Sequence, residues 1–577
     1  MFYESIKLHF SPKIDQERVH ITLTAAPVNV LVGPNGAGKS LALRELISLI
    51  SLPNDRKIIC ARRATREALR EAQEGPRALD FLVDDDTAEK IATLPEDWHS
   101  DLRSFSVPNL ADHADIAAMA KRERNNWRDA CRATIQRLEK LEARRVVLSA
   151  FFSLGQVGSG ERGRFANSPK SRLDALYRDR GSLETLRDII FENFGFYPVI
   201  DVSGAQLVLR LSRARPAEGL EYVHSPESEA FMDRASTPDD LSDGTRTYLG
   251  LWAHLLSGDE RLIFLDEAGA MLHPPLARQL GKQLANVAME RRGHLFAATH
   301  SADFLLGCIQ AGCKVNVIRL THRDGVSTAR ILSADDLRPL MYDPLMRSAN
   351  VLSGLFHDGV VVCEGDADRV FYQEINERLV DIKEGMPSCH FVNAQNWQTT
   401  PRIAGALRNL GIPAAMLIDL DAVIHPDFYR LLECAGVPSP FLHGLGQVRG
   451  DLAREFEGKE NRERRNEFKQ RGLGAVSKEM LPGWQDYLRM IAEYGIFAVP
   501  TGELESWLPQ LGVPRGHKGN WVVGTFAGMG SDPEAAGYLR PDNVGPWAFL
   551  RSIARWIHNP ERQGMPPLPS DPAHAPT

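Results

Sequence analysis

The sequence predicts an α/β protein with a parallel sheet in each half of the 577-residue chain. An apolar run before residue 33 leads into a glycine-rich loop and then into a helix-forming stretch. Four apolar residues at 262–265 end in an acidic pair. In the second half, three further apolar runs each lead to acidic residues. Strands of a parallel sheet gather such side chains along one edge, which is why the pattern favours this fold class.

Composition limits the class of protein. With 43% hydrophobic and 25% charged residues, the chain is typical of a globular protein of roughly two to four domains. Its net charge of −7 means that any nucleic acid must contact a local basic patch. The seven cysteines show no metal-finger spacing, so we expect reduced thiols and a cytoplasmic protein. No run reaches the ~20 apolar residues of a membrane span, so we expect no membrane partner.

The first half begins with three candidate strands, IKLHF, VHITLTAAP and VNVLV, which predict a β-meander over residues 1–32. The next eight residues, GPNGAGKS, have the pattern of a phosphate-binding loop. Its backbone N–H groups would face a triphosphate, Lys39 would reach the outer phosphates, and Ser40 would offer a hydroxyl to Mg²⁺. The predicted ATP-binding residues here are Gly33, Pro34, Asn35, Gly36, Ala37, Gly38, Lys39 and Ser40.

The stretch after this loop predicts an insertion. Residues 61–147 are charge-rich with helical periodicity, which indicates either a hairpin with one solvated face or an arm that contacts DNA or a partner. Residues 155–168 are rich in glycine and serine and predict a mobile loop. A helix at 183–194 and strands at YPVIDV and AQLVLRLS should follow.

Three further motifs occur in a fixed order. Ser242 and Gly244 lie at a predicted helix N-terminus, whose free N–H groups can bind an anion. Asp266 and Glu267 end a buried strand, where Asp266 would hold Mg²⁺ and Glu267 would polarise the attacking water. His300 ends the next strand.

Together with the phosphate loop, this series resembles an ABC-type P-loop ATPase. The resemblance implies that Ser242 and Gly244 bind ATP held by a second subunit, that LHP at 272–274 crosses the dimer interface, and that His300 is a catalytic residue at the γ-phosphate. It also implies a homodimer or higher homo-oligomer. About 200 residues separate the phosphate loop from Ser242, which resembles the SMC, RecF and OLD groups more than transporters. The position of the Q-loop stays open.

The second half brings a different set of carboxylates. Glu364 follows an apolar run, Asp368 lies on the next helix, Asp419 and Asp421 follow a second run, and Glu503 and Glu505 come after a third. The series EGDAD, DLD and GELE resembles the Toprim domain of OLD-family (overcoming lysogenization defect) nucleases, which place it after an ABC ATPase.

That resemblance implies a two-metal site for Mg²⁺, with Mn²⁺ or Ca²⁺ as alternatives. Its metal ligands would be Glu364, Asp368, Asp419, Asp421, Glu503 and Glu505. Glu364 would be a catalytic residue, and Lys518, or else Lys478, would steady the charge on the phosphate. A mixed-charge helix at 451–472 is either a solvated face or a phosphate-contacting surface.

The predicted organisation is an ATPase domain over 1–345, with a helical insertion or dimerisation region at about 61–200, a Toprim nuclease domain over 346–530, and a helix and disordered tail over 531–577. The expected function is ATP-dependent, metal-dependent DNA cleavage or nicking in antiphage defence, with an accessory defence protein left open. A nucleotide-gated repair or chromosome scaffold and a Toprim RNase acting on tRNA remain alternatives. Whether ATP activates or restrains the nuclease also stays open.

Overall fold

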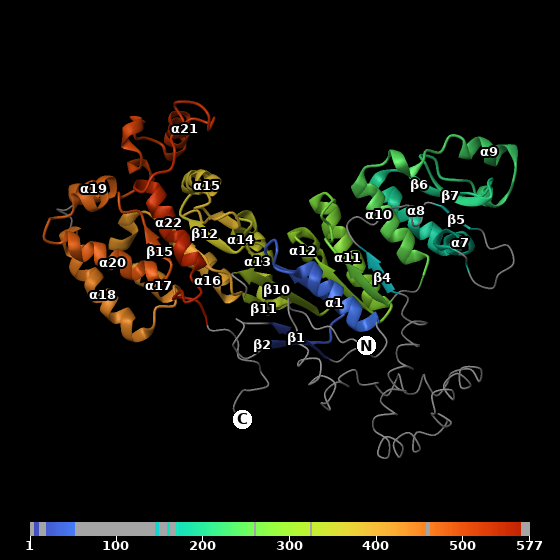
Figure 1. The fold of residues 1–577 in the computed structure, drawn as a ribbon, viewed down its shortest axis with the longest axis horizontal. Coiled ribbons are helices and arrows are strands. Elements are labelled where there is room, and N and C mark those ends of the chain that lie inside the picture. Colours follow the sequence, from blue (N-terminus) through green and yellow to red (C-terminus); the bar gives the residue numbers. More distant parts are fainter. Residues whose placement is uncertain are drawn as a thin grey trace, which may run out of the picture. The chain divides into compact units, whose positions relative to one another are not determined.

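The structure is a computed structural model that describes residues 5–10, 19–51, 145–148, 159–161, 169, 171–258, 261–323, 326–456 and 462–566. The chain divides into two compact units: the first comprises Met1–Val32 and Gly36–Ala334, and the second comprises Asp335–Thr577 together with Gly33–Asn35. Both units are α/β, as the sequence predicts (Figure 1). Within the described ranges, no helix is long and apolar enough to cross a membrane.

The first unit contains a six-stranded sheet in the order β11-β10-β3-β9-β8-β4. Neighbouring strands are parallel except for β11, which pairs antiparallel with β10 at the edge. The strands are β3 (Val28–Val32), β4 (Arg145–Leu148), β8 (Leu262–Leu265), β9 (His294–Ala298), β10 (Val315–Arg323) and β11 (Val326–Ser333).

This parallel sheet forms because its central strands are largely apolar and can be buried on both faces. Every residue of β3, β8 and β9 is buried. Helices α1 (Lys39–Ser51), α11 (Pro274–Glu290) and α12 (Ala302–Gln310) belong to the same unit. Helices α11 and α12 approach so closely that a Cβ on Gly281 would lie 2.2 Å from the Phe304 carbonyl oxygen. The two connections that carry Glu267 and His300 are thus held on a rigid support.

Two predictions about the first unit are wrong. Strands β1 (Ser5–Phe10) and β2 (Val19–Thr24) form an antiparallel pair, but β3 does not extend it into a meander. Because β3 is apolar on both faces, it lies inside the parallel sheet. Residues 145–148, predicted as the end of a helical region, form β4 instead, where two adjacent β-branched valines favour a strand. The rest of the predicted helical region, up to residue 144, lies outside the described residues.

A small antiparallel sheet precedes the helix that begins after Ser242. It has the order β5-β7-β6, with β5 (Ser159–Glu161), β6 (Tyr197–Asp201) and β7 (Gln206–Ser212). The predicted helix and strands at 183–212 are confirmed, but the predicted loop at 155–168 contains β5, and its other residues lie outside the described ranges. The helices of this region are α7 (Arg172–Arg178), α8 (Arg180–Phe194), α9 (Pro226–Met232) and α10 (Asp243–Leu256).

The second unit is built on a four-stranded parallel sheet in the order β13-β12-β14-β15. Its strands are β12 (Gly359–Cys363), β13 (Cys389–Asn393), β14 (Ala414–Ile418) and β15 (Ile496–Ala498). Its helices are α13 (Ala334–Tyr342), which begins at the boundary, α14 (Pro344–Ser348), α15 (Asp366–Asp381), α16 (Thr400–Asn409), α17 (Phe428–Cys434), α18 (Ser439–Ala453), α19 (Arg462–Arg471), α20 (Leu481–Glu493), α21 (Lys518–Met529) and α22 (Gly545–His558).

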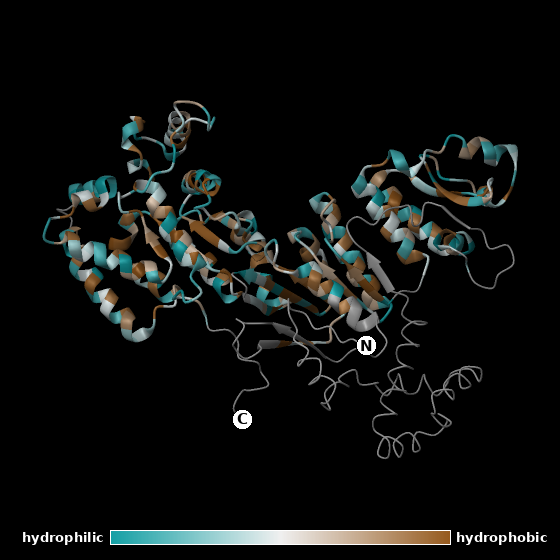
Figure 2. Cartoon of the chain, viewed as in Figure 1, coloured by the Kyte–Doolittle hydropathy of each residue, from teal (hydrophilic) through white to brown (hydrophobic). Residues whose placement is uncertain are grey.

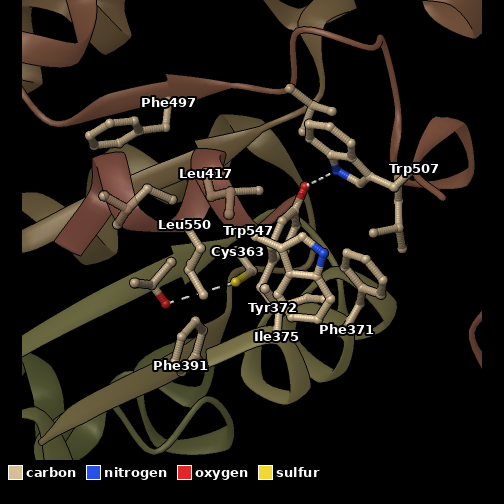
Figure 3. Packing of buried hydrophobic residues seen from close by; sticks show 14 of the residues in the cluster. Cys363, Phe371, Tyr372, Ile375, Phe391, Leu417, Phe497, Trp507, Trp547 and Leu550 are labelled. Atoms are coloured by element: carbon tan, nitrogen blue, oxygen red, sulfur yellow. Dashed lines mark hydrogen bonds between the residues drawn. The ribbon is translucent and has the colours of Figure 1, made fainter. Parts of the chain in front are cut away.

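An aromatic core supports this sheet (Figure 3). The Trp507 indole N–H donates a hydrogen bond of 2.7 Å to the Tyr372 hydroxyl, which ties the segment after β15 to α15. The predicted C-terminal amphipathic helix is confirmed as α22, whose Trp547 and Leu550 join the core. Figure 2 shows strands β12 and β15 as largely hydrophobic and α19 as largely hydrophilic, as its mixed-charge sequence predicts.

Candidate active sites

The predicted phosphate loop joins β3 to α1. Gly33, Gly36 and Gly38 have φ of 141°, 76° and 90°, which side chains with a Cβ rarely adopt. Lys39 is the first residue of α1, so the loop leads directly to the free N–H groups of a helix N-terminus. The sequence therefore builds an anion-binding turn in this position.

Two side chains link this loop to the end of β8. The Ser40 hydroxyl donates a hydrogen bond of 2.9 Å to Asp266 Oδ1, which also accepts the Glu267 backbone N–H at 3.1 Å. Burial lowers the pKa of Lys39 to about 8, although the charges of Asp266 and Glu267 act against this shift. The structure thus brings together Lys39, Ser40, Asp266 and Glu267. From the sequence, these residues are predicted to contact the phosphates, Mg²⁺ and the attacking water.

Glu267 has a left-handed backbone, with φ of 51°. Such a conformation costs a residue with a side chain about 1–2 kcal/mol, so neighbouring bonds must hold it. The next residue, Ala268, provides them: its N–H donates to the Ala298 carbonyl at 2.9 Å, and its carbonyl accepts the Thr299 hydroxyl at 2.6 Å. The direction of Glu267 is therefore set by the end of the neighbouring strand β9.

His300 follows Thr299 at the end of β9. Partial burial and the charge of Lys39 lower its pKa, while Asp266 acts against them. The charges of Lys39 and Asp266 therefore both influence His300, and its role at a γ-phosphate stays a prediction. Thr299 was not singled out by the sequence analysis, although a threonine directly after an apolar strand was its visible signal.

Ser242 caps helix α10, as the sequence predicts. Its hydroxyl accepts the Thr245 N–H at 3.4 Å, and the two hydroxyl oxygens lie 2.9 Å apart. Gly244 is buried in the first turn, where an added Cβ would lie only 2.3 Å from the Met271 carbonyl oxygen. The N-terminus of α10 is therefore packed directly on the loop that follows Glu267.

The second unit gathers the predicted carboxylates at the carboxyl edge of its sheet. Glu364 follows β12, while Asp419 and Asp421 follow β14. Asp368 lies in the first turn of α15, and the segment after β15 carries Glu503 and Glu505.

Hydrogen bonds and ion pairs join the members of this set. The backbone N–H of Asp419 donates to Glu364 Oε2 at 3.1 Å. Lys518 Nζ donates to Asp419 Oδ2 at 2.9 Å and lies 3.5 Å from Asp368 Oδ2. Asp368 and Asp419 are only 1% and 3% exposed. Of the two lysines proposed from the sequence, Lys518 lies at the acids and Lys478 is exposed.

Two more basic residues contact the outer carboxylates. Lys469 on α19 lies 3.7 Å from Asp421 and 4.0 Å from Glu503. Arg515 donates to Glu503 Oε1 at 3.2 Å. In the sequence, Lys469 is only one of several basic residues in a predicted charged helix, and the one signal for Arg515 is its place three residues before Lys518.

Comparisons with known proteins match both units. Residues 122–307 match the family model "AAA domain, putative AbiEii toxin, Type IV TA system". Residues 355–421 match the model "Overcoming lysogenization defect protein-like, TOPRIM domain". The chain has the ATPase–Toprim architecture of the OLD family. Its two domains support ATPase and nuclease activity, and they imply the use of a nucleotide and a divalent metal.

Similarity to other known proteins is weak. No curated protein sequence matches it. A crystal structure of an SmcHead bound to the C-winged helix domain of ScpA is 11% identical, with a TM-score of 0.33, and the match covers 58% of this chain and 99% of that one. For cbiO1 from Clostridium perfringens, the identity is 11%, the TM-score 0.26 and the coverage 61% and 96%. TM-scores this low support no conclusion.

The chemistry of the acidic residues fits a divalent cation in this OLD-type Toprim domain. Burial raises the pKa of Glu364, Asp368 and Asp419, and neighbouring carboxylates add to these shifts, while the charge of Lys518 acts against them. Within the part of the chain that the structure describes, the buried atoms Asp368 Oδ1 and Asp419 Oδ1 have no hydrogen-bond partner. Carboxylate oxygens are the donors that Mg²⁺ prefers. Among the described residues, however, no three such side chains are arranged to hold one ion, and the ammonium of Lys518 contacts two of them.

Proposed function

We propose that this protein is a metal-dependent DNA endonuclease controlled by ATP. The observation that supports this most directly is the group at one sheet edge in which Lys518 contacts the buried Asp368 and Asp419, and half-buried Glu364 accepts the Asp419 N–H. In the first unit, the Ser40 hydroxyl lies 2.9 Å from Asp266, and these are the two kinds of side chain that would hold Mg²⁺ beside ATP in a P-loop ATPase. Antiphage defence in the cytoplasm, with DNA as substrate, is the role that the OLD resemblance favours.

The roles of the residues follow from the chemistry of phosphodiester cleavage. Glu364, Asp368, Asp419 and Asp421 would hold divalent ions, with Glu503 and Glu505 at the outer position. A bound Mg²⁺ or Mn²⁺ supplies Lewis acidity and a low-pKa water at such a site. Lys518 would stabilise the charge that develops on the phosphate in the transition state. Glu267 would orient the water that attacks ATP, with His300 at the γ-phosphate.

Purified protein incubated with plasmid, linear DNA and tRNA tests this function. Each substrate is combined with Mg²⁺, Mn²⁺ or Ca²⁺, with and without ATP. We expect cleavage or nicking of DNA that needs the metal and responds to ATP. Cleavage of tRNA alone would make the protein an RNase, and stable binding without cleavage would make it a nucleotide-gated scaffold.

We further propose that ATP turnover needs a homodimer, because Ser242 and Gly244 would complete a site on the partner subunit. In a mixed dimer, a Ser242→Arg subunit and a Lys39→Ala subunit would retain one intact composite site. Each homodimeric variant should be inactive, whereas the mixed dimer should regain part of the wild-type rate. An active Ser242→Arg homodimer would contradict the composite site.

A further inference from the structure

Helices α15 and α21 run parallel and are joined along their length. Near their N-termini, Asp368 lies 3.5 Å from Lys518 Nζ. One turn later, the rings of Phe371 and Trp521 lie 5.5 Å apart. At the other end, the Arg378 guanidinium donates to the Met529 carbonyl at 3.1 Å. The contacts advance in step along both helices, so the axial position of α21 is fixed relative to α15.

Arg378 makes most of the contact at the C-terminal end. It is 4% exposed and also donates to the carbonyls of Gly530 at 2.6 Å and Leu539 at 3.0 Å. Its guanidinium lies 4.3 Å from the centre of the Tyr538 ring. The last carbonyls of a helix have no partner within the helix, and a cation there is favoured by the helix dipole. Arg378 therefore anchors the C-terminus of α21.

The anchored helix begins with Lys518, whose ammonium meets Asp419 at 2.9 Å. A helix rises about 1.5 Å per residue, so a slip by one residue would move the Lys518 backbone by about that distance. Donor–acceptor distances in N–H···O hydrogen bonds vary by only about 0.5 Å, so such a shift would break the bond between Lys518 and Asp419. The position of Lys518 at the acidic residues thus depends on what holds the far end of its helix.

We propose that Arg378 is a positioning residue of the nuclease centre, which acts by keeping α21 in the register that places Lys518 at Asp368 and Asp419. It does not touch the substrate. This inference rests on the proposed nuclease function. It adds that cleavage depends on Arg378, a residue outside the acidic motifs.

The test compares Arg378→Met with a matched control, Arg408→Met. Arg408 is also buried, at 1% exposed, and donates to the carbonyls of Ala414, Ala435, Tyr494 and Gly564, none of which lies on α21. Its guanidinium lies 5.0 Å from the Trp556 ring centre, so the two arginines have similar surroundings. Both variants should melt at lower temperature than the wild type.

At a temperature where both variants are folded, Arg378→Met should slow single-turnover cleavage by about ten- to a hundredfold, because small misplacements of a catalytic group have effects of this size. Its affinity for the nucleic acid and its ATP turnover should match the wild type, and Arg408→Met should cleave normally. Wild-type cleavage by Arg378→Met, or equal losses in both variants, would overturn the proposal. If Arg378→Met does not fold, Arg378→Lys, which keeps the charge but fewer donors, replaces it.

A double-mutant cycle separates this inference from the nuclease proposal. Unfolding by urea is measured for Arg378→Met, Lys518→Met and the double variant. Substitutions more than about 10 Å apart normally have additive effects on the free energy of unfolding. Non-additive effects of Arg378→Met and Lys518→Met would therefore show that the two residues are coupled through α21. Additive effects would overturn the positioning role. If the wild type cuts no nucleic acid, the nuclease proposal fails while the cycle still gives its answer.

Discussion

Thr299 is a single hydroxyl on which two parts of the ATP site depend. It is fully buried, donates to the Ala268 carbonyl at 2.6 Å and accepts the Ser301 N–H at 2.9 Å. One bond fixes the backbone directly after Glu267, and the other fixes the backbone directly after His300. A residue without chemistry of its own therefore aligns two residues proposed to act on ATP.

Thr299→Val should accordingly lower the kcat for ATP with little change in KM. Valine has nearly the same shape but leaves two backbone groups unpaired, which costs about 1–3 kcal/mol of stability. Thr299→Ser, which keeps the hydroxyl, should restore turnover. Steady-state kinetics of both variants are the measurement. An active valine variant would show that the hydroxyl does not position Glu267.

Because of Lys39, the affinity for ATP should depend on pH. Burial lowers its pKa to about 8, against an ordinary value of 10.5, so between these pH values the unfolded chain binds more protons than the folded one. The free protein should therefore gain stability as pH rises through this window. Phosphate charge at the loop would raise the pKa again, so ATP binding at pH 9 should take up a proton.

Calorimetry of ATP binding at pH 9, in two buffers with different ionisation enthalpies, measures this uptake. At pH 6.5, where Lys39 is already charged, the buffer dependence that arises from this residue should disappear. Equal binding heats in both buffers at pH 9 would contradict the assignment.

At the scale of elements, the N-terminus of α10 is held against the loop after β8. Gly244 permits this approach, since a Cβ there would lie 2.3 Å from the Met271 carbonyl oxygen. Gly181 holds the equivalent second position of α8, also behind a capping side chain, but its nearest atom would be 3.4 Å away.

Gly244→Ala should therefore displace α10 or its loop and lower ATP turnover by roughly tenfold or more, which corresponds to about 1.4 kcal/mol in the transition state. Gly181→Ala should leave turnover unchanged and leave stability equal or slightly higher, because alanine favours a helix. ATPase rates and melting curves of the two variants provide the comparison. A fully active Gly244→Ala enzyme would mean that this packing does not matter for catalysis.

Elements whose pattern is local could be predicted from the sequence. Apolar runs predict the buried strands β12 and β14. The cap of α10 follows from one side chain, that of Ser242. The partner of a strand could not be predicted in the same way. Strand β3 looked like the end of a meander, and β4 looked like the end of a helix, because pairing is decided by residues far away in the chain.

The same limit applies to the sites. The acidic residues could be predicted because parallel strands bring their carboxyl ends to one edge. The residues that hold the site residues in place could not be predicted. Thr299, Arg378 and Arg515 act through backbone carbonyls or side chains far away in the chain, and no sequence motif marks them. Lys518 itself came from a family resemblance, and its contact with Asp419 arises only once α21 is packed on α15.

At the scale of the whole molecule, the two proposed reactions use carboxylates that lie in different units. Glu267 belongs to the first unit and Glu364 to the second. The reactions should therefore be separable by single substitutions. Glu364→Gln keeps an acceptor for the Asp419 N–H but removes a charge from the buried group, so it should abolish cleavage and leave ATP turnover near wild type. Glu267→Gln should bind ATP yet hydrolyse it about a hundredfold more slowly or worse.

Metal binding gives this experiment a second readout. Buried carboxylates that raise one another's pKa are stabilised by cations, so divalent metal should raise the melting temperature of the second unit's transition. The rise should be smaller in Glu364→Gln but unchanged in Asp366→Asn, a control that removes an exposed carboxylate paired with Arg369. Full cleavage by Glu364→Gln, or a wild-type melting temperature insensitive to metal, would exclude Glu364 from a metal-dependent centre.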